Sequence, residues 1–280
     1  MKTMKKTGKQ YNKINLRAYG ALMRSGIMET LQFRASAIVM LFGNIVYLVV
    51  IYNLWKAIYA SVDTPVVNGM TFNDTMIYLV LASAQFSFME ARLVWLMGWS
   101  IQDGDIVVQL LRPISYEMYN LFYIIGQNMC SFVATFIPTF IIVEIVTHGA
   151  IPIGVNIIYY LIAVLIGSLI NFAVDFFVGT ICLYTQSIWG INIMKEILVT
   201  FLSGATVPLA FFPETLHKIV MFLPFHAIYN TPLTLLIHDD LPIEQIADMI
   251  LTQFVWLVIV LVIAKVFWRA SERVITVNGG

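Results

Sequence analysis

Long apolar runs separated by short polar stretches form the main pattern of this 280-residue sequence. A hydrocarbon core of about 30 Å takes about 20 helical residues. The runs therefore predict six membrane-spanning helices, at residues 36–55, 75–90, 118–143, 156–182, 189–208 and 249–268. Glu90 and Arg92 indicate that the second run approaches the membrane interface there. With 60% apolar and 11% charged residues, the chain is predicted to be an all-α integral membrane protein, a single transmembrane domain over residues 1–280.

A basic amphipathic helix is predicted before the first span, over residues 14–34. Its apolar positions recur at steps of three and four residues: Leu16, Tyr19, Met23, Ile27 and Leu31. Arg17 and Arg24 fall on the opposite side. Such a helix suits the interface at a membrane surface. It suits burial against the protein's own cytoplasmic side equally well, so both interpretations stay open.

The distribution of basic residues predicts the orientation in the membrane. Eight of the sixteen Lys and Arg residues lie in the first 34 positions. With six spans, Arg112 and the basic residues near the C-terminus share that side: Lys265, Arg269 and Arg273. Because basic residues favour the cytoplasmic face, both termini and the loop after the second span are predicted to be cytoplasmic, in a multi-pass protein of the plasma membrane.

The loop at residues 99–117 carries an ordered pattern, DGDIVVQLLRPIS. Asp105 is a good N-cap, a cation at Arg112 suits the negative end of a helix, and Pro113 stops the helix. The apolar residues fall on one face at helical spacing: Ile106, Val107, Leu110 and Leu111. A helix of about two turns is unstable alone in water, so this face needs a structure to dock against. Asp103 and Asp105 flank Gly104 outside the bilayer, where capping and solvent contact are favoured over catalysis.

The segment at residues 208–247 differs from an ordinary loop. It holds five of the nine prolines in the sequence, yet the residues between them are mostly apolar. These apolar pieces are too short to cross a membrane, so we expect re-entrant helices in the outer leaflet, which are tolerated where protein covers the backbone. An interfacial loop is the alternative.

Four polar residues at predicted membrane depth are candidates for the translocation path or for polar contacts in the bundle: Asn171, Asp175, Lys195 and Glu196. A charge at depth costs at least about 2.5–3.5 kcal/mol on insertion scales and tends to face the bundle interior. Lys195 and Glu196 are the expected partners of Asp175, as a structural ion pair or as a substrate contact. The sequence contains no Gly-rich phosphate loop, so we expect no nucleotide site in this chain. Its four histidines show no paired metal spacing, and we expect no catalytic residue, metal or cofactor here.

Two motifs resemble those of the permease subunits of type-2 ABC transporters, exporters whose ATPase is a separate subunit. DGDIVVQLLRPIS is similar to the family's coupling loop, and SGATVPLAFFPETLHKIVMFLPFHAIYNTP is similar to its outer segment. The first motif is carried by Gly104, Asp105, Leu110, Leu111, Arg112, Pro113, Ile114 and Ser115. The second is carried by Ser203, Gly204, Pro208, Leu209, Phe212, Pro213, Leu223, Pro224, Phe225 and Pro232.

The resemblance implies a role for each unusual segment. Residues 14–34 would be the connecting helix, Asp103 to Pro113 would couple to a cytoplasmic ABC ATPase that binds ATP and magnesium, and residues 208–247 would be the outer re-entrant segment. Such permeases work as dimers with the same or a related chain, often as heterodimers. The implied function is bacterial export of a hydrophobic or amphipathic compound, as in multidrug, peptide or lipid efflux. Membrane lipid is an expected partner and nucleic acid is not.

An ion-coupled secondary transporter is the alternative, with Asp175 and the Lys195–Glu196 pair as its coupling site. Six predicted spans without a visible internal repeat argue against it.

Overall fold

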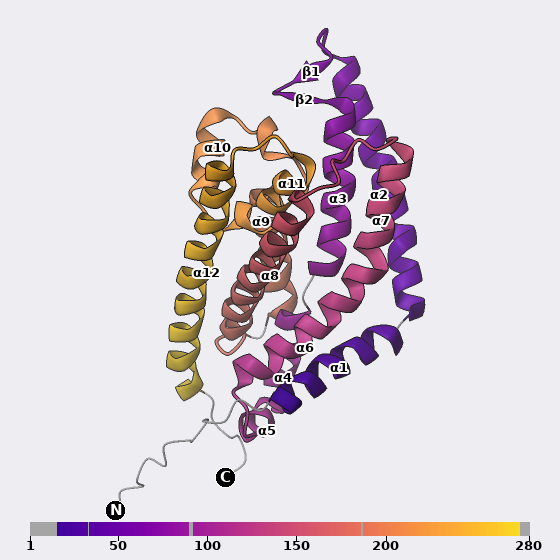
Figure 1. The fold of residues 1–280 in the computed structure, drawn as a ribbon. Coiled ribbons are helices and arrows are strands. Elements are labelled where there is room, and N and C mark those ends of the chain that lie inside the picture. The colour runs from indigo at the N-terminus through magenta and orange to yellow at the C-terminus, as the bar shows by residue number, and fades with distance from the viewer. Residues whose placement is uncertain (1–15, 33, 90–91, 186, 275–280) are drawn as a thin grey trace, which may run out of the picture.

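The structure is a computed structural model that describes residues 16–32, 34–89, 92–185 and 187–274. Long helices run side by side, and α1 (Leu16–Gln32) lies across one end of them (Figure 1). Within the described residues, four helical stretches are long and apolar enough to cross a membrane: Phe72–Gln102, Tyr116–Val146, Asn156–Ile181 and Ile243–Ser271. The prediction of an all-α membrane protein is confirmed at this level.

Two further helices correspond to predicted spans but are not among these four stretches. Helix α2 (Arg34–Ala60) has 27 residues and covers the first predicted span, but its apolar part with described side chains is limited to Val46–Ala60. Helix α9 (Ile188–Leu202) has 15 residues, which is about 22 Å at 1.5 Å per residue. It is therefore shorter than a hydrocarbon core of about 30 Å, so the count of six spans goes beyond what the structure supports.

The second predicted span does not leave the bundle at Arg92. Helix α3 (Phe72–Met89) is followed by α4 (Leu93–Gln102), in which Leu93, Val94 and Met97 are fully buried. Arg92 is exposed, so its charge avoids the core while the apolar sequence continues. Glu90, the other expected interface residue, lies outside the described residues. The apolar stretch therefore continues through the ten residues of α4, beyond the two charges that were expected to mark the approach to the interface.

The third and fourth predicted spans agree with the structure. Tyr116–Val146 consists of α6 (Tyr116–Ser131), the π-helix η1 (Phe132–Phe136) and α7 (Ile137–Val146). Pro138 lies in the first turn of α7, and because proline has no N–H to donate, the helical hydrogen-bond pattern changes just before it. Helix α8 (Asn156–Ile181) matches the fourth predicted span to within one residue.

Helix α8 lies at the centre of the packing, against α12 (Ile243–Ser271), α11 (Asn230–Ile237) and α4. Small residues on α8 allow close approach: a Cβ at Gly179 would lie 2.6 Å from the sulfur of Met97, and one at Gly167 would lie 3.0 Å from the carbonyl oxygen of Ile228. Close packing matters because lipid removes the hydrophobic drive between helices.

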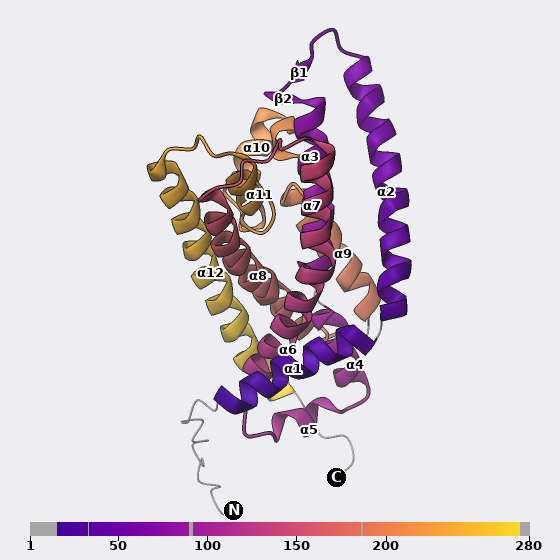
Figure 2. The same cartoon turned by 45° about the vertical axis from the view of Figure 1, so that its right-hand side comes forward.

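The two ends of the bundle carry different short elements (Figures 1 and 2). The α5 end, defined by α1, α5 (Ile106–Leu110) and the end of α12, contains the predicted helix 14–34 as α1; residues 14, 15 and 33 lie outside the described residues. The opposite, α10 end contains α10 (Glu214–Met221), η2 (Leu209–Phe211), η3 (Phe225–Ala227) and a hairpin of β1 (Val66–Val67) with β2 (Met70–Thr71). Asn68 and Gly69 turn this hairpin at positive φ, as hairpin turns of two residues require.

Candidate functional site

Helix α5 is a single five-residue piece between two chain reversals. Gly104 precedes it at φ +80°, where a residue without a Cβ is favoured. Asp105 occupies the N-cap position but its side chain makes no capping hydrogen bond, so the expected capping role is wrong. The next helix is capped instead: the Ser115 hydroxyl accepts a hydrogen bond from the backbone N–H of Met118 at the start of α6. Gly104 and Ser115 thus explain two positions of the sequence motif.

Helix α5 is apolar on both sides, and the bundle covers one of them. Ile106 is 3% exposed and packs with Leu93, Tyr116 and Trp268, and two further predicted face residues, Val107 and Leu110, pack against the same cluster. The other side presents Val108 and Leu111, which are 62% and 79% exposed. The predicted face therefore docks mainly on the chain's own bundle. The outward side includes Val108, which the sequence pattern had not indicated.

Arg112 lies beyond the end of α5 and contacts the following helix. Its guanidinium carbon is 4.5 Å from the centre of the Tyr119 ring, within the range of a cation–π interaction. Arg112, Pro113, Asp103 and Asp105 are all exposed. The Tyr119 contact holds Arg112 beside Leu111, on the outward side of the loop.

Helix α1 is fixed to α6 by two glycines that face each other. A Cβ on Gly26 would lie 2.2 Å from the carbonyl oxygen of Tyr123, and one on Gly126 would lie 2.1 Å from that of Met23. The two backbones are therefore in direct contact, and the rings of Tyr19 and Phe122 stack beside them at 4.4 Å. This docked face agrees with the interpretation of α1 as a helix buried against the protein itself.

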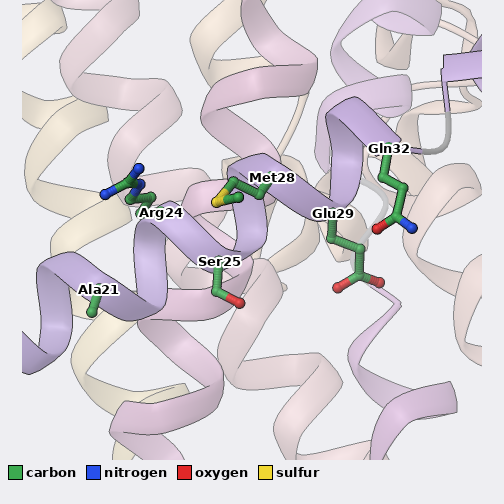
Figure 3. A pocket seen from close by; sticks show the side chains of 6 residues that line it. All are labelled: Ala21, Arg24, Ser25, Met28, Glu29 and Gln32. Carbon is green, nitrogen blue, oxygen red and sulfur yellow. The ribbon is translucent and has the colours of Figure 1, made fainter.

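The opposite face of α1 stays open and lines a shallow hollow (Figure 3). Arg24 and Met28 project from one side of the helix in this view, and Ser25 and Glu29 from the other. Leu16, Met28 and Leu31 are all exposed by more than half. A helix with one docked face and one exposed face that mixes charged, polar and apolar residues also keeps the interpretation as an interfacial helix open.

The polar residues predicted at membrane depth come together between α8 and α9. Lys195 Nζ lies 2.9 Å from Asp175 Oδ1, and the two side chains are 8% and 0% exposed. Asn171, one turn before Asp175, donates a hydrogen bond of 2.9 Å to the carbonyl oxygen of Met89 at the end of α3. This cluster therefore joins α3, α8 and α9, and the expected pairing of Asp175 with Lys195 is present.

Glu196, the other expected partner of Asp175, has a different one. Its Oε1 accepts a hydrogen bond from Nδ2 of Asn192, one turn earlier on α9. Glu196 and Lys195 both line a narrow recess that Phe86 and Tyr229 also border. The recess lies near the middle of α9.

The sequence interpretation missed two buried glutamines that hold the backbone of the proline-rich segment. Gln85 of α3 donates from Nε2 to the carbonyl oxygen of Ile228 at 2.9 Å. Gln253 of α12 donates from Nε2 to the carbonyl oxygen of Ala227 at 2.7 Å. Both glutamines are fully buried. Two consecutive carbonyls next to η3 are thus satisfied by side chains from two separate long helices.

Asn156 acts in the same way at the end of α11. Its Nδ2 donates to the carbonyl oxygen of Leu236 at 2.7 Å and to that of Pro152 at the same distance. Irregular backbone within a membrane protein requires such internal partners. In the sequence, these residues are uncharged amides inside or beside apolar runs. A hydropathy profile alone does not single them out.

The predicted outer-segment residues form the turns of this region. The chain leaves α9 through a Schellman motif: Gly204, at φ +81°, donates to the Phe201 carbonyl and Ala205 donates to the Thr200 carbonyl. Ser203 is fully buried beside this turn. The remaining predicted residues lie at helix starts or pack in the core: Pro208 precedes η2, Pro213 precedes α10, Pro224 precedes Phe225 of η3, and Phe212 stacks on Phe201.

Comparison with known proteins gives one match. The model of the family described as ABC-2 family transporter protein matches residues 38–279, which include every described helix after α1 except the first four residues of α2. No curated protein sequence matches the chain.

Proposed function

The chain belongs to the ABC-2 transporter family, and we propose that it is the permease subunit of an ATP-driven exporter that is coupled through α5 to a separate ATPase. ABC-2 permeases are membrane transport components, and the ATPase of such a transporter is normally a separate subunit. Export, coupling through α5, pairing with a second permease and the substrate are the parts that we propose here.

The exposed side of α5 is the observation that carries the proposal. A short helix with apolar residues on both sides is expected to be covered on both, yet Val108 of α5 and Leu111, which follows the helix, are largely exposed. Burying one such side chain is worth about 1.5–3 kcal/mol, so two of them supply a useful docking energy. Arg112 is held beside them by Tyr119. Its guanidinium can form a bidentate contact with a carboxylate of the ATPase.

The proposed topology has six membrane-crossing segments with the α5 end in the cytoplasm of a bacterial cell. Helix α2 supplies the first crossing, and α9 supplies the fifth together with the re-entrant segment that follows it. Its short length supports this, because the chain after the Schellman turn runs through η2 and α10 to backbone that Gln85 and Gln253 hold. In this arrangement α10, α11 and the β-hairpin face outward.

A second permease, identical or related, completes the translocation path. The outer side of α9 supports this, because Met194, Ile197 and Phe201 are exposed on a helix whose other side carries the Asp175–Lys195 pair. The substrate is a hydrophobic or amphipathic compound.

Purification in a mild detergent tests the proposal. A tagged chain expressed in its native host should retain an ABC ATPase and a second permease chain, both identified by mass spectrometry. A variant with Val108→Ser and Leu111→Ser should lose the ATPase and keep the permease partner. Gln245→Met, at an exposed position of α12, serves as the control. Recovery of the chain without any ATPase would contradict the proposal, and proton-driven transport in that preparation would favour the ion-coupled alternative.

A further inference from the structure

The recess beside α9 has an unbalanced charge. Lys195 lines it, but the Lys195 ammonium is paired with the buried Asp175 carboxylate, so these two charges cancel. Glu196 also lines the recess, and its described hydrogen-bond partner is the neutral Asn192 amide. Among the described residues that line the recess, Lys195 is the one cation. The recess and its supporting pair therefore carry a net charge of about −1 from Glu196.

Asn192 holds this carboxylate from one turn earlier on α9, by donating to it from Nδ2. Its side chain is 1% exposed, and its Oδ1 accepts no hydrogen bond within the described part of the chain. Asn192 does not line the recess itself, so a ligand in the recess meets Glu196 and not this amide. Asn192, Glu196 and Thr200 are spaced by four residues and therefore lie on one face of α9.

Two aromatic rings border the same recess. Phe86 and Tyr229 stack with their centroids 6.5 Å apart. The face of an aromatic ring attracts an organic cation, and a desolvated carboxylate attracts it more strongly. An anionic head group would meet Glu196 at close range and be repelled. The chemistry of the recess thus favours a positively charged nitrogen.

The surroundings of the recess are apolar. Ile197, next to Glu196 on α9, is 62% exposed, and Met194 is 58% exposed. The recess is narrow, with room for roughly one water-sized group, so only the ammonium of a ligand enters it while the rest of a bound molecule lies along these side chains.

We propose that Glu196, beside the rings of Phe86 and Tyr229, forms a binding site for the protonated amine of an amphipathic organic cation, whose apolar part lies along the exposed side of α9. The inference rests on the proposed transport function and specifies the charge of its substrate. Asp175 and Lys195 are positioning residues in this arrangement, because their mutual neutralisation leaves the charge of Glu196 uncompensated.

The test compares two probes that differ in one charge. The purified complex in detergent binds a dansyl-labelled long-chain amine or its uncharged N-acetyl derivative, and affinities are measured by fluorescence. A charge-assisted hydrogen bond corresponds to a preference for the amine of roughly tenfold or more. Glu196→Gln should abolish this preference, and Glu196→Asp should retain most of it. Glu214→Gln, at an exposed carboxylate on α10, should leave it unchanged.

A second measurement uses the wild-type chain, so it does not depend on whether Glu196→Gln folds. An apolar carbodiimide should modify Glu196, as detected by peptide mass spectrometry, and the amine should protect it where the acetylated probe does not. Equal affinity for both probes, a preference that survives Glu196→Gln, or absence of protection would overturn the proposal. Because ATPase retention is measured in the same preparation, failure of the amine site with the ATPase present leaves the exporter assignment standing.

Discussion

Two short helices, α11 at one end of the bundle and α5 at the other, are both rich in apolar residues but differ in how they are covered. In α11, five of eight residues are buried, including Leu233, Leu235 and Leu236. In α5 only Ile106 is buried, and Val108 is 62% exposed. The chain covers α11 by itself but covers only one side of α5, and the second side is the one that we propose docks on the ATPase.

The two helices also differ in which contacts hold the backbone around them. Buried amides from distant helices satisfy the carbonyls beside α11 and at its end, through Gln85, Gln253 and Asn156. Around α5 the fixed points are local: the positive φ of Gly104, the Ser115 cap and the stacking of Arg112 on Tyr119. The α10 end is therefore tied to the whole bundle, while α5 is presented by its own flanking turns.

The largest expected effect comes from removing the exposed side of α5. Val108→Ser with Leu111→Ser should lower affinity for the ATPase about 100-fold or more, because two apolar contacts of about 1.5–3 kcal/mol each are lost. Permease-stimulated ATP hydrolysis should disappear while thermal stability stays near that of the wild type. The matched control is Ile106→Ser, on the covered side, which should instead lower thermal stability. If both variants behaved alike, the distinction between the two sides of α5 would be lost.

The second effect concerns the ion pair that lies between the two ends. Asp175→Leu leaves the Lys195 ammonium buried without its carboxylate, and breaking a buried pair costs about 3–5 kcal/mol. Asp175→Asn keeps a hydrogen-bond acceptor and should lose less. Thermal unfolding in detergent, followed beside transport, separates the two. Wild-type stability in both variants would mean that the pair contributes little to joining α8 and α9.

A smaller effect is expected at the amide contacts of the α10 end. Gln253→Met keeps the size of the side chain but removes the donor to Ala227, which should cost about 1–3 kcal/mol. Protease cleavage within the segment at residues 222–229 should become faster. Gln245→Met on the same helix is exposed and should change neither property. Equal cleavage rates for the two variants would show that the amide does not hold this segment.

The smallest expected effect lies at the contact between α1 and α6. Gly126→Ala places a methyl group 2.1 Å from the Met23 carbonyl oxygen, so the helices must separate, at a cost of about 1–3 kcal/mol. Gly20→Ala is the control, since a Cβ there meets nothing within 4 Å. Cysteines at Tyr19 and Phe122 should form a disulfide less readily with Gly126→Ala than with Gly20→Ala. Equal cross-linking would argue against a rigid α1–α6 contact.

The sequence predicted the long helices well because apolar runs are a local property. It placed α8 to within one residue and marked the proline-rich segment as broken helix. It expected the second apolar run to approach the interface at Glu90 and Arg92, although α4 continues with buried apolar residues from Leu93. In that case local charge did not mark the end of the apolar stretch.

The candidate sites were predicted less completely, for two physical reasons. Spacing showed that Ile106 and Leu110 share a face of α5, but it does not say which face turns toward the bundle. Contacts such as Gly26 with Gly126, or Gln253 with Ala227, join positions far apart in the chain. They can be recognised only once the fold is known. The pairing of Asp175 with Lys195 was predictable because a buried charge requires a partner.

Cross-linking from one exposed apolar residue at each end tests the central claim most directly. Leu111 near α5 and Phe222 at the end of α10 are 79% and 78% exposed, so exposure alone does not distinguish them. A photoreactive amino acid is placed at either position in the full-length chain, and membranes are irradiated with the ATPase present. The proposed coupling predicts a covalent product with the ATPase from position 111 and none from position 222. No product from position 111, or equal products from both positions, would contradict the assignment of α5 as the coupling helix.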